Sequence, residues 1–377
     1  MTIIDRYLIW QFSRVFVVTF VSLLGVYIMA DSVGNFDEFV DLARQSGDGW
    51  RPFLNYYLAR VPLFFELTGR IVTVLAVVFT VAWLRRNNEM TALMAAGVSR
   101  WRLAKPLVLV GLLISVLAVF NRELGVPAVR AQLCNSAKEL ASGRIERLTP
   151  RWDNQTNILI HAESIIPRDK ILIKPRFMLL SSWSKIGRTI TAEKAEFHDA
   201  QPDRPSGYWL RQVDGSEFLA DVPSYFLGEH PVILSPRDVD WLAADECFVV
   251  SQLRLERLRR GREWEQYSST GQLVRGLHNP SVEYGPDVRV LVHTRFIQPF
   301  LDMALLFLGL PFVVADQRSN VFVAAGKTML VVSLFSVAVM TSQAMGIHCI
   351  LSPAFAAWAP LITLGPLAFL MAGPLQS

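Results

Sequence analysis

Charged residues are scarce in this chain. They make up 19% of its 377 residues, and none lies between Thr328 and Ser377. Hydrophobic residues make up 52% and are gathered in blocks, which is typical of a membrane protein. Only three cysteines and six histidines occur, with no Cys-x-x-Cys pair and no two histidines at helical i, i+3 or i, i+4 spacing. The sequence therefore predicts no metal site.

Motifs for catalysis and for nucleic-acid binding are also missing. There is no Gly-x-Ser-x-Gly sequence and no paired-carboxylate motif of a hydrolase. The run VFVAAGKTM at 321–329 ends like a phosphate-binding loop, but Val321 stands where such a loop needs a glycine. The net charge is +4, yet no basic run with interleaved aromatics is present. We expect no catalytic residue, no cofactor and no nucleic-acid partner.

Six apolar blocks are long enough to cross a bilayer as helices, which takes about 20 residues. They lie at roughly 9–30, 61–84, 105–121, 296–315, 328–350 and 354–374. We interpret the first block as a retained helix, because Arg14 interrupts it and no small-residue cleavage site closely follows Ala30. The predicted fold class is a membrane α-helical protein with six transmembrane helices, three on each side of an inserted domain.

Charges beside the spans predict the orientation. Segment 85–105 carries five basic residues and one acid, whereas 31–60 carries three basic residues and five acids. Because basic loops stay in the cytoplasm, we expect 85–105 and both chain termini to be cytoplasmic and the inserted domain to lie on the outer side of the membrane.

The inserted domain reads as all-β. Four short runs rich in Ile, Leu and aromatic residues are separated by turn signals, at 157–166, 170–183, 188–198 and 207–220. They predict an antiparallel sandwich or jelly roll, joined to the membrane by helical connectors at 123–147 and 249–264. The expected domains are 1–121, 122–295 and 296–377. A disulfide between Cys134 and Cys247 is left open.

Three ionisable residues fall within or beside the apolar spans, where an unpaired charge is costly. Glu66 and Arg70 stand four residues apart on one helix, in the favourable order for an ion pair. Asp302 enters the fourth span from the same side as Arg70. One interpretation is that the three residues line a polar cavity open to the outer leaflet. The alternative is a purely structural ion pair near the membrane interface.

The cytoplasmic segment between the second and third spans, RRNNEMTALMAAGVSRWRL at 85–103, is longer than a loop requires. Apolar residues form one helical stripe, which consists of Met90, Leu93, Met94, Gly97, Val98 and Trp101. Asn87 is a suitable cap, Gly97 can end a short helix, and Ser99 can cap the next one. The pattern predicts a helical elbow at 88–98 that either lies on lipid or docks into a partner protein.

Five segments resemble, in order, the LptF/LptG family of lipopolysaccharide-transport permeases. They are IIDRYLIWQF, NNEMTALMAAGVSRWRLAKPL, NRELGVP, the β segment ITAEKAEF with GYWLRQVDG, and RFIQPFLDMALLFLGLPFVV. The resemblance implies three helices, a periplasmic jelly roll and three further helices in the bacterial inner membrane. It also implies that lipopolysaccharide is drawn from the membrane and passed to a periplasmic bridge protein.

The same resemblance implies a cytoplasmic ABC ATPase dimer and a second permease as partners. The elbow then corresponds to a coupling helix in a groove of the ATPase. Its expected contact residues are Glu89, Met90, Leu93, Met94, Ala96, Gly97 and Val98. Known members carry basic residues near the outer end of the first helix, whereas here Asp31, Asp37, Glu38 and Asp41 stand there, so no lipid-phosphate contact is predicted at that end.

Two alternatives remain from the residues themselves. One is a membrane-anchored sensor or scaffold whose β domain binds a ligand without transport. The other is a secondary transporter, although its substrate site calls for broken helices and midplane charges, which the last two spans lack.

Overall fold

The structure is a computed structural model, and it describes most of the chain. The described residues are 3–46, 49–134, 150–166, 171–183, 186–202, 204–228, 230–255, 258, 264–279, 281, 284–314 and 321–373. They form two compact units, one built from 1–141 and 285–377 and the other from 142–284. We describe each unit by itself.

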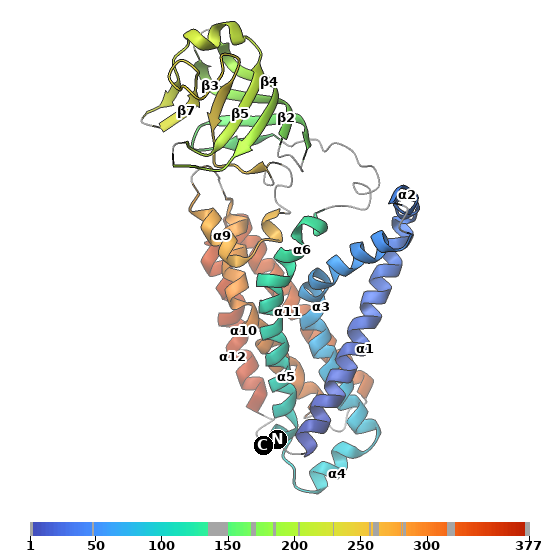
Figure 1. Cartoon of the computed structure of the whole chain (residues 1–377). Helices are drawn as coiled ribbons and strands as arrows, with labels where there is room; N and C mark the ends of the chain where they lie inside the picture. Colours follow the sequence, from blue (N-terminus) through green and yellow to red (C-terminus); the bar gives the residue numbers. More distant parts are fainter. Residues whose placement is uncertain are drawn as a thin grey trace. The chain divides into compact units, whose positions relative to one another are not determined.

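The first unit is helical and the second is mainly β (Figure 1). The helical elements are α1 (Ile3–Gly34), α2 (Phe36–Ser46), α3 (Arg51–Arg86), α4 (Glu89–Ala95), α5 (Arg100–Phe120), a π-helical turn η1 (Asn121–Gly125), α6 (Val126–Leu133), α10 (Pro286–Val314), α11 (Val321–Ile347) and α12 (Pro353–Ala372). The elements of the second unit are β1 (Arg151–Asp153), β2 (Ile158–Ile166), β3 (Ile171–Trp183), β4 (Gly187–His198), β5 (Gly207–Val213), a 3-10 turn η3 (Ser216–Asp221), β6 (Tyr225–Leu227), β7 (His230–Leu234), β8 (Cys247–Val250) and α9 (Thr270–Leu277).

Six helices of the described residues are long and apolar enough to cross a membrane, which confirms the predicted spans. Several continue beyond the apolar block that marks them. Helix α3 is the clearest case, since it runs for 36 residues and starts at Arg51, well before the apolar stretch. The extra turns carry aromatic and charged side chains, which suit the membrane surface.

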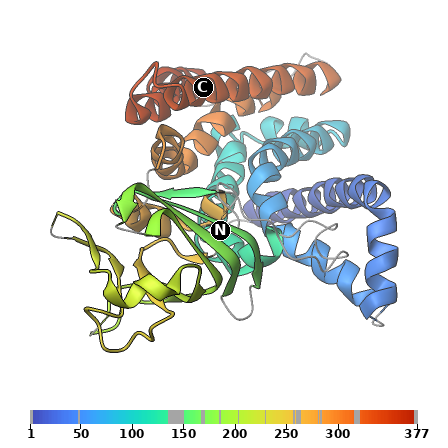
Figure 2. The ribbon, with the colours of Figure 1, turned by 90° about the horizontal axis from the view of Figure 1, so that it is seen from above.

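Helix α10 lies at the centre of the helical unit and α1 at its side. In the most apolar window of each helix, 61% of α10 but only 6% of α1 is buried. Figure 2 shows α1 at one flank of the unit, away from α12. Close packing at the centre depends on Gly111 of α5, where a Cβ would come within 2.6 Å of Leu306 Cδ1 of α10. Helix α1 therefore meets the rest of the unit over a small part of its surface.

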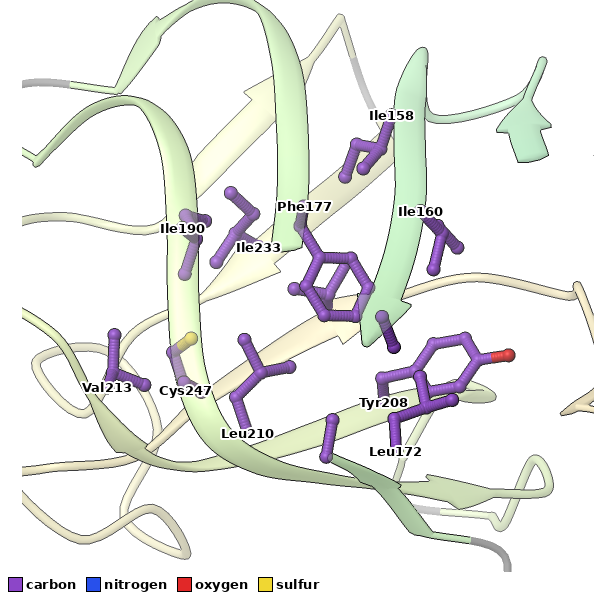
Figure 3. Packing of buried hydrophobic residues seen from close by; sticks show 14 of the residues in the cluster. Ile158, Ile160, Leu172, Phe177, Ile190, Tyr208, Leu210, Val213, Ile233 and Cys247 are labelled. Atoms are coloured by element: carbon purple, nitrogen blue, oxygen red, sulfur yellow. The ribbon is translucent and has the colours of Figure 1, made fainter. Parts of the chain in front are cut away.

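The β unit is one curled antiparallel sheet. Its strand order is β1-β2-β3-β4-β5-β8-β7-β6. Alternate residues of the strands turn into the curl, where Phe177, Tyr208 and Leu210 are fully buried (Figure 3). The Tyr208 hydroxyl reaches the edge of this core and donates to the Leu253 carbonyl at 2.6 Å. The predicted membrane helical protein with an inserted all-β domain is confirmed.

Two local predictions in the β unit were wrong. The run at 207–220 is strand only to Val213, because a turn follows and residues 216–221 form η3. The helical connector expected at 249–264 begins instead with the end of β8, since Val249 pairs with Ile233 and Tyr208. Of the connector at 123–147, residues 135–149 lie outside the described residues. No disulfide is formed in the part of the chain that the structure describes.

Candidate functional site

The elbow between α3 and α5 is a separate short helix at one end of the helical unit (Figure 1). Asn88, with φ 57°, turns the chain out of α3 and into α4. Gly97, with φ 81°, turns it again; this left-handed conformation favours glycine. Ser99 then caps α5, because its side chain accepts from the Arg102 amide at 3.4 Å. The expected cap at Asn87 was wrong, since Asn87 ends α3.

Four residues of the predicted apolar stripe face the chain's own helices, whereas its last members on either side of Val98, Gly97 and Trp101, are exposed. Met90 is only 3% exposed and belongs to the buried cluster of α1, α3, α5 and α10. Leu93, Met94 and Val98 pack against the same cluster and are half-buried. A gap of about 10 Å³ remains beneath the helix, lined by Leu8, Val81, Leu84, Met90, Leu93, Leu103, Leu107 and Val314. The stripe thus fixes α4 to the bundle, and Met90 is not accessible to a partner.

The opposite face of α4 is open and consists of small side chains. Its exposed residues are Thr91, Ala92, Ala95, Ala96 and Gly97. Of the expected contact set, only Ala96 and Gly97 lie on this face. Thr91, Ala92 and Ala95 also lie on this face but are outside the expected contact set. Apolar periodicity marks the side that a protein buries for itself, and small residues on the other side give no periodic signal.

Glu89, at the start of α4, is held by the first helix. The Tyr7 hydroxyl donates to Glu89 Oε2 at 2.8 Å. The Trp83 side chain of α3 also interacts with the Tyr7 hydroxyl. Neither contact is visible in the sequence, because Tyr7 and Glu89 are 82 residues apart.

A second cluster joins α3, η1 and α10. Glu66 forms an ion pair with Arg122, whose Nε donates to Glu66 Oε1 at 2.5 Å. Arg122 Nη1 also approaches the Arg295 carbonyl at 3.5 Å. Asn121 Nδ2 donates to the Pro62 carbonyl at 2.8 Å. The ion partner of Glu66 is therefore Arg122 rather than Arg70, because η1 brings Arg122 against α3.

Arg70 and Asp302 line one small cavity between α3, α5 and α10. The cavity measures about 20 Å³ and is lined by Gly69, Arg70, Thr73, Val74, Gly111, Ile114, Ser115, Ala118, Asp302 and Leu306. This is room for roughly one water molecule. Asp302 accepts from Gln298 Nε2 at 2.8 Å. Two of the three expected cavity residues are thus brought together, and Glu66 does not line the cavity.

The acidic end of α1 is tied to α3. The Tyr57 hydroxyl donates to Asp31 Oδ2 at 2.8 Å. Around it, Phe39 of α2 packs on Tyr56 and Tyr57 with ring centroids 5.1 and 5.7 Å apart. Arg60 lies over the Tyr56 ring, 3.4 Å from its centroid. At this acidic end, Asp31 therefore makes at least one structural contact.

No group of three or more His, Cys, Asp or Glu side chains within the described ranges is placed to hold a metal ion.

The comparison with protein families decides the broader identity. A model of the lipopolysaccharide export system permease LptF/LptG matches residues 6–372. The chain belongs to the LptF/LptG family. A comparison with curated proteins finds no match.

Membership of the LptF/LptG family agrees with the six apolar helices and the inserted β unit. An LptF/LptG chain is a permease component of the lipopolysaccharide export system, which makes it a multi-pass protein of the inner membrane. The elbow at 88–98 and the polar residues Arg70 and Asp302 are accordingly the candidate sites carried forward.

Proposed function

We propose that this permease moves lipopolysaccharide out of the inner membrane. A separate cytoplasmic ABC ATPase dimer drives the transport and binds the exposed face of α4. A second permease of the same family completes the membrane channel, and a periplasmic bridge protein receives the lipid. The observation that carries the proposal is α4 itself, a short helix fixed to the bundle on one side and bare on the other.

The packing of α4 favours a protein partner over lipid. An interfacial helix needs a free apolar face to place on the bilayer, but the apolar stripe of α4 is used inside the chain. The free face carries Thr91, Ala92, Ala95 and Ala96, whose small side chains allow close approach of a groove wall. Because Met90, Leu93 and Met94 pack into the bundle, a push on this face is passed to α3, α5 and α10.

Charge supports the orientation in the proposal. The five basic residues of 85–105 favour a cytoplasmic position for the elbow, on the side of the membrane where ATP is hydrolysed. The β unit, whose chain leaves after the third span, is then periplasmic. Lipid leaving the membrane would pass along the curled sheet.

The test is purification of the full complex in mild detergent, with the copurifying ATPase and second permease quantified. Ala92→Arg and Ala96→Arg place a large charged side chain on the free face of α4. We expect each to reduce the bound ATPase by about tenfold or more, since steric misfit and a buried charge at an interface cost about 2 kcal/mol or more. The second permease should stay bound.

Ala220→Arg is the matched control, because it makes the same change at an exposed turn of the β unit. It should leave the ATPase bound. Undiminished ATPase in Ala92→Arg and Ala96→Arg complexes would contradict docking at α4. A wild-type preparation with no ATPase and no second permease would favour the sensor or scaffold alternative instead.

A further inference from the structure

We infer that Tyr7 is a positioning residue that transmits the movement of α4 to the first helix through its hydrogen bond to Glu89. The inference rests on the proposed coupling of α4 to an ATPase. It adds a specific route by which the push on α4 reaches α1.

The polar part of this link is the bond from the Tyr7 hydroxyl to Glu89 Oε2 at 2.8 Å. Its acceptor is a carboxylate, and hydrogen bonds to charged groups are stronger than those between neutral groups. Glu89 is the first residue of α4. A displacement of α4 therefore acts on Tyr7 without passing through a flexible loop.

An apolar contact lies directly beside the polar one. Leu8, the neighbour of Tyr7, is fully buried and lines the same gap as Met90 and Leu93 of α4. Phe12, one turn further along α1, is also fully buried in this cluster. The first turns of α1 are thus held against α4 by two kinds of contact.

Beyond these turns α1 is packed on one face only. Val17, Val18, Val21 and Val26 are each more than half exposed. On the other face, the Phe20 ring packs on those of Phe64 and Phe65 of α3, with centroids 5.6 and 5.9 Å apart. The next polar attachment is at the far end, where Tyr57 bonds to Asp31. A helix held by polar contacts at its ends and by apolar contacts on one face between them can tilt when one end is moved, because apolar contacts are not directional.

The bond links a displacement of α4 to a movement of α1. Trp83 of α3 also interacts with the Tyr7 hydroxyl, so the hydroxyl that donates to Glu89 has a second partner on α3. When α4 is displaced by its partner, the Glu89 carboxylate carries the Tyr7 ring with it. Helix α1 then changes its angle to α3, which alters the lipid-facing side of the permease.

The experiment uses the full exporter in liposomes and measures lipopolysaccharide moved per ATP hydrolysed. Tyr7→Phe removes the hydroxyl and keeps the ring, in the wild-type chain and in a Glu89→Ala chain. In the wild-type chain we expect about a threefold to tenfold loss of lipid moved per ATP, the size expected for one such hydrogen bond. In the Glu89→Ala chain, Tyr7→Phe should cause no further loss, since the two residues act through one bond.

Tyr57→Phe is the matched control, because it removes the other tyrosine bond of α1. Its effect should be the same in both backgrounds. Equal losses from Tyr7→Phe in both backgrounds, or no loss in either, would overturn the inference, as would a Tyr57→Phe effect that also depends on Glu89. Loss of the bound ATPase from the Tyr7→Phe complex would show that the bond only seats the partner, whereas absence of ATPase from the wild-type complex would instead remove the proposed function.

Discussion

Glu66 of α3 and Arg122 of the π-helical turn η1 form an ion pair that joins two helices across 56 residues of sequence. Their side chains are 18% and 13% exposed, so both charges are largely removed from solvent. The pair fixes the point where α5 gives way to η1 against the middle of α3.

Removal of one partner should destabilise the helical unit. In Arg122→Ala, Glu66 keeps its charge without its cation, and we expect a loss of about 2–4 kcal/mol, seen as a lower thermal unfolding midpoint in detergent. Arg86→Ala, at an exposed position of the same α3, should change stability by less than about 0.5 kcal/mol. Adding Glu66→Gln to Arg122→Ala should restore part of the loss, and an unchanged midpoint in Arg122→Ala alone would count against the pair.

The cavity between Arg70 and Asp302 offers a second prediction. We hypothesise that these two residues serve lipid transport through a polar opening toward the outer leaflet. Arg70→Ala and Asp302→Ala should each lower lipid transport in the reconstituted exporter by about tenfold or more, with the ATPase still bound. If both variants transport at the wild-type rate, the cavity has only a structural role. Gln298→Leu should reduce transport less, since it removes a neutral partner of Asp302.

Gly97 should tolerate only residues that accept a left-handed backbone. Its φ is 81° and nothing lies within 4 Å of where a Cβ would stand, so the cost of substitution is conformational and not steric. Gly97→Ala should lower stability by about 1–2 kcal/mol and weaken ATPase binding by changing the angle of α4. Gly97→Asn should be milder, because asparagine visits this region more readily. Equal stability of the alanine variant and the wild type, measured by thermal unfolding, would argue that the turn adjusts.

Cys247 makes the β unit sensitive to alkaline pH. Complete burial raises the pKa of its thiol well above the ordinary value, so the folded state keeps the proton that the unfolded state releases above about pH 8.5. Stability should then fall as pH rises through that value, by up to about 1.4 kcal/mol per pH unit. Thermal unfolding between pH 7 and pH 10 measures this, and Cys247→Ala should flatten the profile. Maleimide labelling read by peptide mass spectrometry should find Cys349, which is exposed, and spare Cys247 until the sheet unfolds.

The membrane spans were predictable because a bilayer imposes a length and a composition on each helix. The elbow was also largely predictable, since Gly97 and Ser99 are local signals that act on their own neighbours. The direction of its apolar stripe was not. Periodicity shows that Met90 and Leu93 share a face, but the neighbour that covers this face is decided by packing of distant segments.

Long-range polar pairs could not be predicted from the sequence for a similar reason. Glu66 has an arginine four residues away on its own helix, yet it pairs with Arg122, which the π-helical turn rotates into reach. In the β unit, the four long runs were recognised from their hydrophobic pattern, whereas short strands such as Tyr225–Leu227 and Cys247–Val250 have too few residues to show alternation. Their pairing is fixed by partners elsewhere in the sheet.

The one-sided packing of α1 has a consequence for how the protein is made. Its partners at both ends, Glu89 and Tyr57, are synthesised after it. Helix α1 must therefore enter the bilayer before these partners exist. Its valine-rich surface faces lipid until α3 and α4 have been synthesised. Its own hydrophobicity supports insertion, and its two tyrosine bonds fix its position only after insertion. Substitutions at Tyr7 or Tyr57 should therefore leave biosynthesis intact and alter the function of the folded permease.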